Sequence, residues 1–157
     1  MICQFCYTST MLGFNHVLAG SIIAVITPAP FVPFVALASH FLFDTFPHFG
    51  ESKTVYPYTK SFKWLLAIDA LACILGLILA IWLFPSQWFI VLIGVFFSAS
   101  PDFLWLFEHR GGPQWFQRFL VWANRIQWGE RPYGWLFDVF YAGLFVFTLF
   151  ALAGKLI

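Results

Sequence analysis

The chain alternates between long apolar runs and short polar links, and these runs predict membrane helices. A helix that crosses a bilayer needs roughly 20 apolar residues, with a range of about 17–25. We predict five membrane segments, at residues 11–26, 31–47, 64–84, 88–107 and 133–152. The first two segments are short. The proline-rich link between them is either a tight turn outside the membrane or a re-entrant tip.

A different pattern fills residues 113–128, where apolar positions recur at spacings of three and four. The apolar positions are Trp115, Phe116, Phe119, Leu120, Trp122, Ala123 and Ile126. Gln, Asn and Arg occupy much of the opposite face, and Pro113 suits the first turn of a helix. This pattern predicts an amphipathic helix that lies in the membrane interface, or else a surface helix packed on the bundle. The predicted fold is an all-α integral membrane bundle that forms one domain over residues 1–157.

Composition supports lipid as the solvent of this chain. Hydrophobic residues make up 61% of the 157 positions and charged residues only 10%, against about 45–50% and about 25% in soluble domains. A domain of this size buries only about 70% of its unfolded surface, so a soluble core could not absorb this apolar area. The same numbers argue against disorder, and a net charge of +1 argues against nucleic-acid binding. Membrane lipids are the expected partners, and the aromatic surface leaves homo-oligomer packing open.

Basic residues predict the orientation. They gather in two links, between segments two and three and between segments four and five, whereas the other two links carry no charge. In a five-segment topology both basic links lie on one side of the membrane. The positive-inside rule therefore places them and the N-terminus in the cytoplasm. Lys155 is the exception, on the opposite side.

The first ten residues carry separate questions. They lack the basic region of a signal peptide, and Met11 is an alternative start of the chain. Cys3 and Cys6 form a CxxC pair without a second pair, which is weak evidence for zinc or redox chemistry. Their function stays open.

The acids and histidines converge on the predicted cytoplasmic face. All seven acids and all four histidines fall there in this topology. Asp44, Asp69, Asp102 and Asp138 come from four different segments, and an Asp near the bilayer centre costs about 2.5–3.5 kcal/mol on insertion scales. So many carboxylates cannot ionise together without a cation. Either some are protonated, or Arg side chains pair with them, or a metal ion holds them.

His40, Asp44 and His48 give the sharpest local signal, because positions i, i+4 and i+8 share one helical face. Neighbours are about 6 Å apart along the axis. One metal would use His40 with Asp44, or Asp44 with His48, and two metals bridged by Asp44 could use all three. Pro47 can end or bend the helix and move His48 inward. Histidine with aspartate suits a divalent Zn, Mn or Fe ion; the alternative is a set of hydrogen bonds across the bundle.

A second signal follows the proline inside segment four. Pro101 frees a backbone carbonyl and re-aims Asp102. His109 and Arg110 precede Gly-Gly-Pro, which breaks the helix and lets both side chains fold back over the site. Arg110 matches a phosphate, since its planar fork fits phosphate oxygens, or it binds lipid headgroups at the interface.

These observations define a set of candidate site residues. The expected metal ligands are His16, His40, Asp44, His48 and Asp102, with His109 and Asp138 as further candidates. Asp69 stands beside the ligands or replaces one of them. Asp69 or Glu108 is the candidate general base, and Arg110 is the candidate contact for the substrate.

Several of these motifs together resemble a known family. The motifs are Asn15-His16 with Gly20, the His40, Asp44 and Pro47-His48 stretch, Pro101-Asp102, and His109-Arg110-Gly111. They look like the YdjM-like family over about residues 13–112. The resemblance implies a membrane-bound, metal-dependent hydrolase of the bacterial inner membrane.

The leading functional prediction is a metal-dependent hydrolase that acts on a lipid phosphoester or another amphiphile at headgroup depth. Metal-bound water would supply the nucleophile. A proton- or cation-coupled transport protein is the first alternative, because intramembrane Asp and His are typical of proton relays. A non-enzymatic membrane interaction subunit is the second.

Overall fold

The computed structural model describes residues 12–49, 60–104, 113–126, 130–131 and 133–156. This part of the chain is almost entirely helical. Its α-helices are α1 (Gly13–Ile26), α2 (Val32–Phe43), α3 (Lys60–Leu83), α4 (Trp88–Ala99), α6 (Gln114–Ile126) and α7 (Trp135–Leu156). Three 3-10 turns, η1 (Ala29–Phe31), η2 (Pro85–Gln87) and η3 (Ser100–Leu104), lie between or extend them. The all-α prediction is confirmed for these residues, apart from one short strand pair.

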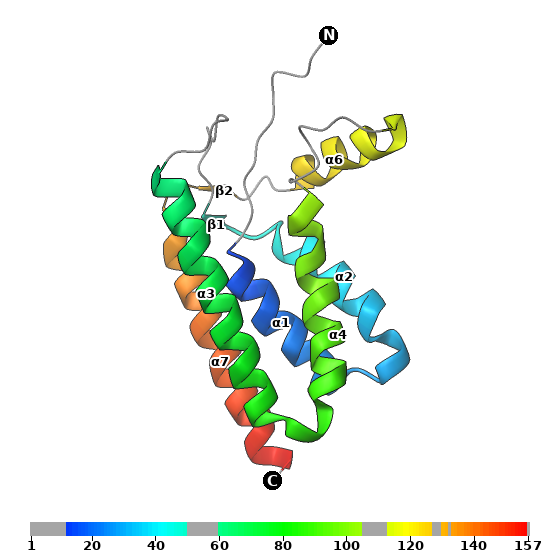
Figure 1. Cartoon of the computed structure of the whole chain (residues 1–157), viewed down its shortest axis with the longest axis vertical. Coiled ribbons are helices and arrows are strands. Elements are labelled where there is room, and N and C mark those ends of the chain that lie inside the picture. Colours follow the sequence, from blue (N-terminus) through cyan, green and yellow to red (C-terminus); the bar gives the residue numbers. More distant parts are fainter. Residues whose placement is uncertain (1–11, 50–59, 105–112, 127–129, 132, 157) are drawn as a thin grey trace.

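Helix α1 is the central element of the bundle (Figure 1). It packs against α2, α3, α4 and α7, and it is buried continuously from Asn15 to Ser21. In Figure 1, α3 and α7 lie along one side of α1, while α2 and α4 lie along the other. A residue on α1 can therefore reach every other long element, which makes this helix the natural carrier of a shared site.

Two glycines let α1 and α4 approach closely. A Cβ added to Gly20 would lie 2.6 Å from the carbonyl oxygen of Gly94, and one added to Gly94 would clash with the carbonyl oxygen of Gly20. Gly94 and Ser98, four residues apart on α4, form the small-residue pattern that permits such contact in membrane bundles. This contact fixes how α1 lies against α4.

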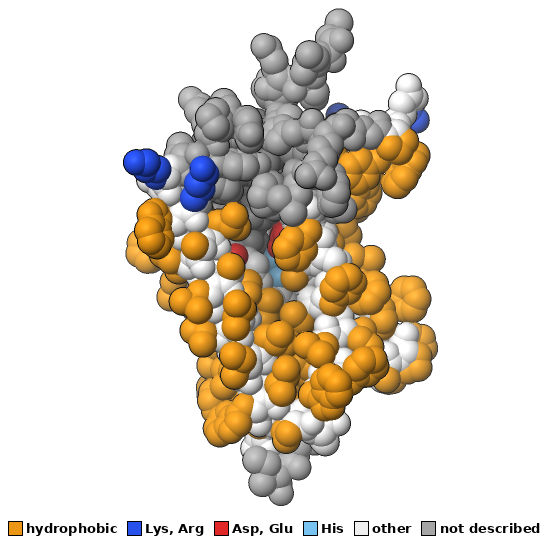
Figure 2. Space-filling model, in the orientation of Figure 1, with side chains coloured by type: hydrophobic (Ala, Val, Ile, Leu, Met, Phe, Trp, Pro, Cys, Tyr) orange, Lys and Arg blue, Asp and Glu red, His pale blue; other side chains and the backbone are white. Residues whose placement is uncertain are grey.

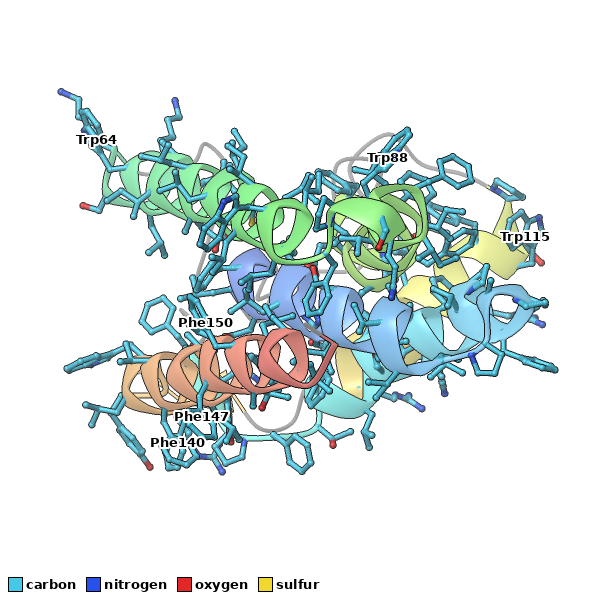
Figure 3. The ribbon with its side chains drawn as sticks, turned by 90° about the horizontal axis from the view of Figure 1, so that it is seen from below. Trp64, Trp88, Trp115, Phe140, Phe147 and Phe150 are labelled. Carbon is cyan, nitrogen blue, oxygen red and sulfur yellow. The ribbon has the colours of Figure 1, made fainter. Side chains whose placement is uncertain are left out.

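The outer surfaces of the longest helices remain apolar and exposed. The stretches Lys63–Leu83, Pro85–Phe103 and Trp135–Gly154 are long and apolar enough to cross a membrane, yet only 11–17% of their most apolar windows are buried. Figure 3 shows labelled aromatic side chains that point outward, among them Trp64 of α3 and Phe147 of α7, each 71% exposed. Water would not tolerate this surface, so lipid is its expected solvent.

The five predicted spans are not confirmed, because the first two helices are short. Helix α1 has 14 residues and α2 has 12, which correspond to about 21 and 18 Å against a hydrocarbon core of about 30 Å. The predicted segment 31–47 is helical only to Phe43, and the chain then turns before Pro47. A residue that precedes proline disfavours the helical conformation, which explains an end in this region.

Two further differences from the predicted pattern concern the ends of helices. Segment 88–107 changes to the 3-10 turn η3 at Ser100, next to Pro101, which has no N–H for the α-helical ladder. Strand β1 (His48–Phe49) pairs in parallel with β2 (Glu130–Arg131), and His48 lies opposite Glu130. The hydropathy pattern did not predict this pair, because two residues are too few to show a period.

The amphipathic helix is confirmed as a helix, α6 at Gln114–Ile126. Its aromatic face packs on α2: the ring of Phe41 lies 6.2 Å from that of Phe119 and 5.3 Å from that of Trp122, between ring centroids. Trp115, near its start, is 71% exposed. The position of α6 in a membrane interface stays a prediction.

Candidate metal centre

The site begins with a histidine in the first turn of the central helix. His16 of α1 is completely buried and lies against His40 of α2, with 4.2 Å between the two ring centroids. Asp44, which follows the last residue of α2, is 1% exposed. Its Oδ1 lies 3.2 Å from Nε2 of His16 and its Oδ2 lies 3.2 Å from Nε2 of His40. The spacing of His40 and Asp44, i and i+4, places both on one face of α2.

Asp102 of η3 completes the group, which we call the metal cluster: His16, His40, Asp44 and Asp102. Its Oδ2 lies 3.9 Å from Nε2 of His16 and its Oδ1 lies 3.8 Å from Nε2 of His40. The Asp102 side chain is 14% exposed, unlike the other three. The sequence predicted these four residues as ligands, and the structure brings all four together from three segments that contact one another.

A backbone contact fixes the orientation of the His40 ring. Nδ1 of His40 donates a hydrogen bond to the carbonyl oxygen of Ser98, at 2.8 Å. The proton on Nδ1 leaves Nε2 free to offer a lone pair to the cluster. This is how protein metal sites commonly hold their histidines, with the second ring nitrogen bonded to a carbonyl or carboxylate.

The carboxylate of Asp44 faces two imidazole nitrogens, each at 3.2 Å. An ionised carboxylate 3.2 Å from a nitrogen lone pair is repulsive. A proton on Nε2 of either imidazole, or a cation that the groups share, removes this repulsion.

The distances fit a shared cation. One ligand atom each from His16, His40 and Asp44 can be chosen so that all lie within 4.8 Å of one another. A tetrahedral ion with bonds of about 2.0–2.2 Å separates its ligand atoms by roughly 3.3–3.6 Å. The contacts of 3.2 Å are close to that separation. Moreover, Nε2 of His16 and both oxygens of Asp102 are buried without a hydrogen-bond partner among the described residues, as expected of groups arranged around an ion.

Asp69 of α3, a candidate general base, is hydrogen-bonded to the first residues of α1. Its Oδ2 accepts the backbone N–H of Gly13 at 2.9 Å, and its Oδ1 accepts that of Phe14 at 3.1 Å. Because the first N–H groups of a helix lack partners within it, this carboxylate of α3 caps α1 from a neighbouring helix. Both oxygens already accept hydrogen bonds.

Asp138 anchors the other side of the same turn. Its Oδ1 accepts the side-chain amide of Asn15 at 3.0 Å, and its Oδ2 accepts the backbone N–H of Phe49 at 2.8 Å. It thereby ties α7 to α1 and β1. The structure places this predicted ligand next to the cluster, where it holds the residue that precedes His16.

His48 lies with Asp138 rather than on the face of α2. It is fully buried on β1, and its Nδ1 donates to the carbonyl oxygen of Phe46 at 2.7 Å. Its Nε2 has no hydrogen-bond partner among the described residues. The helical i+8 relation to His40 does not hold, because α2 ends at Phe43. The remaining predicted site residues, Glu108, His109 and Arg110, lie outside the described residues.

Two contributors to the site were not predicted as site residues. Asn15 and Ser98 are both buried; Asn15 bridges to Asp138, and Ser98 lends its carbonyl to His40. Asn15 adjoins His16 in the sequence, and Ser98 follows Gly94 at the small-residue spacing. Those two signals could have identified them.

The chain matches no protein-family model, no curated protein and no solved structure. The resemblance to the YdjM-like family therefore stays a prediction. What the structure adds is a buried His16, His40 and Asp44 group that could hold a metal ion, in a chain with three helices apolar enough to cross a membrane.

Proposed function

We propose that this protein is an integral membrane, metal-dependent hydrolase whose metal cluster cleaves a phosphoester of a membrane amphiphile. The observation that carries the proposal is the convergence of His16, His40 and Asp44, all buried and within ligand distance of one another. Buried ionisable groups in a membrane helix bundle are costly unless they pair or bind an ion. A divalent metal, Zn, Mn or Fe, satisfies two imidazoles and a carboxylate.

The chain's own residues divide the work. His16, His40 and Asp44 would hold the metal, and the metal would lower the pKa of a bound water toward about 7. Asp102 is the part of the cluster with an exposed edge, and both of its oxygens lack hydrogen-bond donors among the described residues. We assign it to orient the attacking water and to accept its proton. Glu108 and Arg110 keep their predicted roles as a further base and as the phosphate contact.

Membrane placement supports an amphiphilic substrate. The cluster lies toward one end of the bundle, where α3 carries Lys60 and Lys63, and Trp64 next to them suits an interface. We place this end at the cytoplasmic face of the bacterial inner membrane, following the basic links. At that depth a phosphoester group would meet the cluster while its apolar part stays among lipid tails.

Metal content and hydrolysis of a soluble diester test this function. Protein purified in detergent is analysed for bound metals, and its turnover of bis(4-nitrophenyl) phosphate is measured before and after chelation and metal return. We expect about one bound ion per chain, loss of turnover with the chelator and recovery with the metal. His16→Gln should lose both, whereas Thr148→Val, exposed on α7, should lose neither. A wild-type protein without bound metal would overturn the proposal.

A further inference from the structure

Helix α6 lies across one end of the bundle, while α3, α4 and α7 run along its length (Figure 1). Those three helices carry the stretches that are apolar enough to cross a membrane. With them across the bilayer, α6 lies near the plane of the membrane surface, where amphipathic helices bind. Figure 2 shows Lys and Arg side chains at this same end of the molecule, on α3 and on α6.

The exposed face of α6 alternates tryptophan with arginine. Trp115, Arg118, Trp122 and Arg125 follow one another at spacings of three, four and three, and all four are exposed. Such spacings place them along one side of the helix. The sequence groups both tryptophans with the apolar positions of this helix, but the structure leaves them on the exposed side, next to the arginines.

The other side of α6 packs on the bundle. Leu120 is buried, and Phe119 and Trp122 contact the ring of Phe41 on α2, at 6.2 and 5.3 Å between ring centroids. The ring of Phe41 in turn meets the ring of His40 at 5.2 Å, edge to face. These contacts fix which side of α6 faces outward, and they reach a member of the metal cluster. Figure 3 shows Trp115 at the outer edge of the bundle.

The two arginines share a shallow surface pocket of about 340 Å³. Its lining residues are Gln117, Arg118, Val121, Trp122 and Arg125. Within the described residues no ion pair neutralises either arginine, and α6 itself contains no acid. Guanidinium groups match the oxygens of a phosphate. The charge of this pocket therefore complements an anionic phosphate ester.

The tryptophans distinguish a membrane from a dissolved anion. Trp115 and Trp122 are 71% and 48% exposed, and removing an exposed indole from water is favourable. A dissolved phosphate would bind the arginines but leave both indoles in water. A bilayer surface satisfies both residue types, because tryptophan rings settle at the depth of the headgroups.

We propose that the face of α6 formed by Trp115, Arg118, Trp122 and Arg125 binds the headgroups of anionic phospholipids at the membrane surface, and that this contact holds α6 against Phe41 beside the metal cluster. The lipid bound here is a partner of the protein and not its substrate. The inference rests on the membrane placement given above, but it requires neither bound metal nor turnover.

Hydrogen exchange of the full chain in lipid nanodiscs tests the binding. Exchange of the α6 backbone amides is followed by mass spectrometry in phosphatidylcholine, with and without phosphatidylglycerol. We expect at least threefold slower exchange with phosphatidylglycerol and loss of this difference at high salt, since salt screens exposed charges. Equal exchange in the two lipids would overturn the proposal and favour an acidic protein partner. An equal slowing by inorganic phosphate in phosphatidylcholine alone would overturn it as well.

Two double variants compare the charges of α6 with the other charges at this end. Arg118→Gln with Arg125→Gln should abolish the slowing by phosphatidylglycerol. Lys60→Gln with Lys63→Gln removes the same charge from the start of α3 and should change the slowing less than twofold. Arg118→Lys with Arg125→Lys keeps the charge and should retain at least half of the effect. Equal losses in the two glutamine variants would overturn the assignment to α6.

The contact with Phe41 has its own readout. The α2 amides around Phe41 should also exchange more slowly with phosphatidylglycerol. Phe41→Ala removes the ring between α6 and His40, so it should abolish the slowing in α2 while the slowing in α6 persists. If that variant does not fold, Phe41→Leu replaces it, with at least a twofold reduction expected. Undiminished slowing of α2 in a folded variant would overturn this part of the proposal.

The outcomes for lipid binding and for catalysis are separable. Metal content and turnover of the soluble diester are measured on the same samples. Slower exchange of α6 without metal or turnover would leave this inference standing and remove the hydrolase. Metal and turnover without an effect of phosphatidylglycerol on α6 would do the reverse.

Discussion

The four aspartates of the bundle fall into two pairs that differ in what faces their oxygens. Asp69 and Asp138 accept hydrogen bonds from backbone N–H groups and from the Asn15 amide. Asp44 and Asp102 face the Nε2 atoms of His16 and His40 instead. The first pair is satisfied by neutral donors of the protein. The second pair faces imidazole nitrogens, where a shared proton or a bound ion would remove the repulsion between carboxylate and lone pair.

Asp69 and Asp138 thus position the first turn of α1, whereas Asp44 and Asp102 face the imidazoles, where the chemistry would take place. Asp69 holds the N–H groups of Gly13 and Phe14, and Asp138 holds Asn15, so the residues just before His16 are fixed from two sides. A ligand on a rigid, doubly anchored turn keeps its geometry, which metal sites require. Buried acids in a membrane are therefore not all functional in the same sense.

Asp44→Asn should have the largest effect on the metal cluster. The amide keeps the shape of the side chain but removes the charge that both imidazoles face. We expect metal affinity to fall by more than about 100-fold, beyond the range for loss of an outer partner, and turnover to vanish with it. Elemental analysis after dialysis against a metal buffer measures the first. Full metal occupancy in this variant would show that the ion binds elsewhere. Asp44 would then not differ from Asp69 and Asp138 in metal binding.

Asp102→Asn should distinguish the role of Asp102 from that of Asp44, the other aspartate that faces the imidazoles. If Asp102 accepts the proton of the attacking water, turnover should drop by about 10²–10⁴-fold, while metal content stays within twofold of the wild type. Turnover of the soluble diester and bound metal are measured on the same sample. Parallel loss of both quantities would make Asp102 a ligand like Asp44 and contradict its assignment as a base.

Gly20→Ala tests whether the close packing of α1 on α4 maintains the geometry of the metal cluster. The added Cβ would lie 2.6 Å from the carbonyl oxygen of Gly94 and 2.8 Å from Cβ of Ser98, so α1 must move away from α4. Overpacking of this kind costs about 1–3 kcal/mol, and the shift should weaken metal binding as well. Thermal unfolding in detergent and metal titration measure these effects.

The matched control is Gly143→Ala on α7, where an added Cβ would meet nothing within 4 Å. Alanine is the better helix former by about 1 kcal/mol, so this variant should be as stable as the wild type or more so, with unchanged metal content. A destabilisation equal to that of Gly20→Ala would show that the close contact is not the cause.

Asp69→Asn should have the smallest effect, and it should fall on stability rather than chemistry. The amide retains one oxygen acceptor, so one of the two backbone N–H groups of α1 loses its partner. Loss of a helix cap costs about 0.5–2 kcal/mol. We expect a lower midpoint of thermal unfolding with bound metal still near one ion per chain. Loss of metal without loss of stability would instead show that Asp69 acts in metal binding, like Asp44 and Asp102.

Much of the metal cluster could be predicted from the sequence because its signals are local or compositional. His40 and Asp44 share a face by helical spacing, and Pro101 marks the bend that carries Asp102. His16 was predicted as a ligand with them because it falls at the same membrane face, but no spacing rule links it to α2. The separate roles of Asp69 and Asp138 were not predicted, because a carboxylate that caps a helix and one that faces an imidazole look alike in a sequence.

The number of crossings shows the same limit. Hydropathy finds apolar runs but not where a helix ends, so segments 11–26 and 31–47 were predicted as short membrane segments whose full crossing stayed open, and their helices have 14 and 12 residues. The strand pair of His48 with Glu130 joins residues 82 positions apart, and no local pattern encodes such a contact.

By itself, the sequence indicated lipid as the expected solvent of this protein, and it determined the helical class and the chemical types gathered at one end, since these follow from composition and period. Only the tertiary structure decided which carboxylates face imidazoles and which face backbone N–H groups. The physical reason is that this choice depends on how α1 lies against α3, α4 and α7, and that placement is fixed by contacts such as Gly20 on Gly94 between segments far apart in the chain.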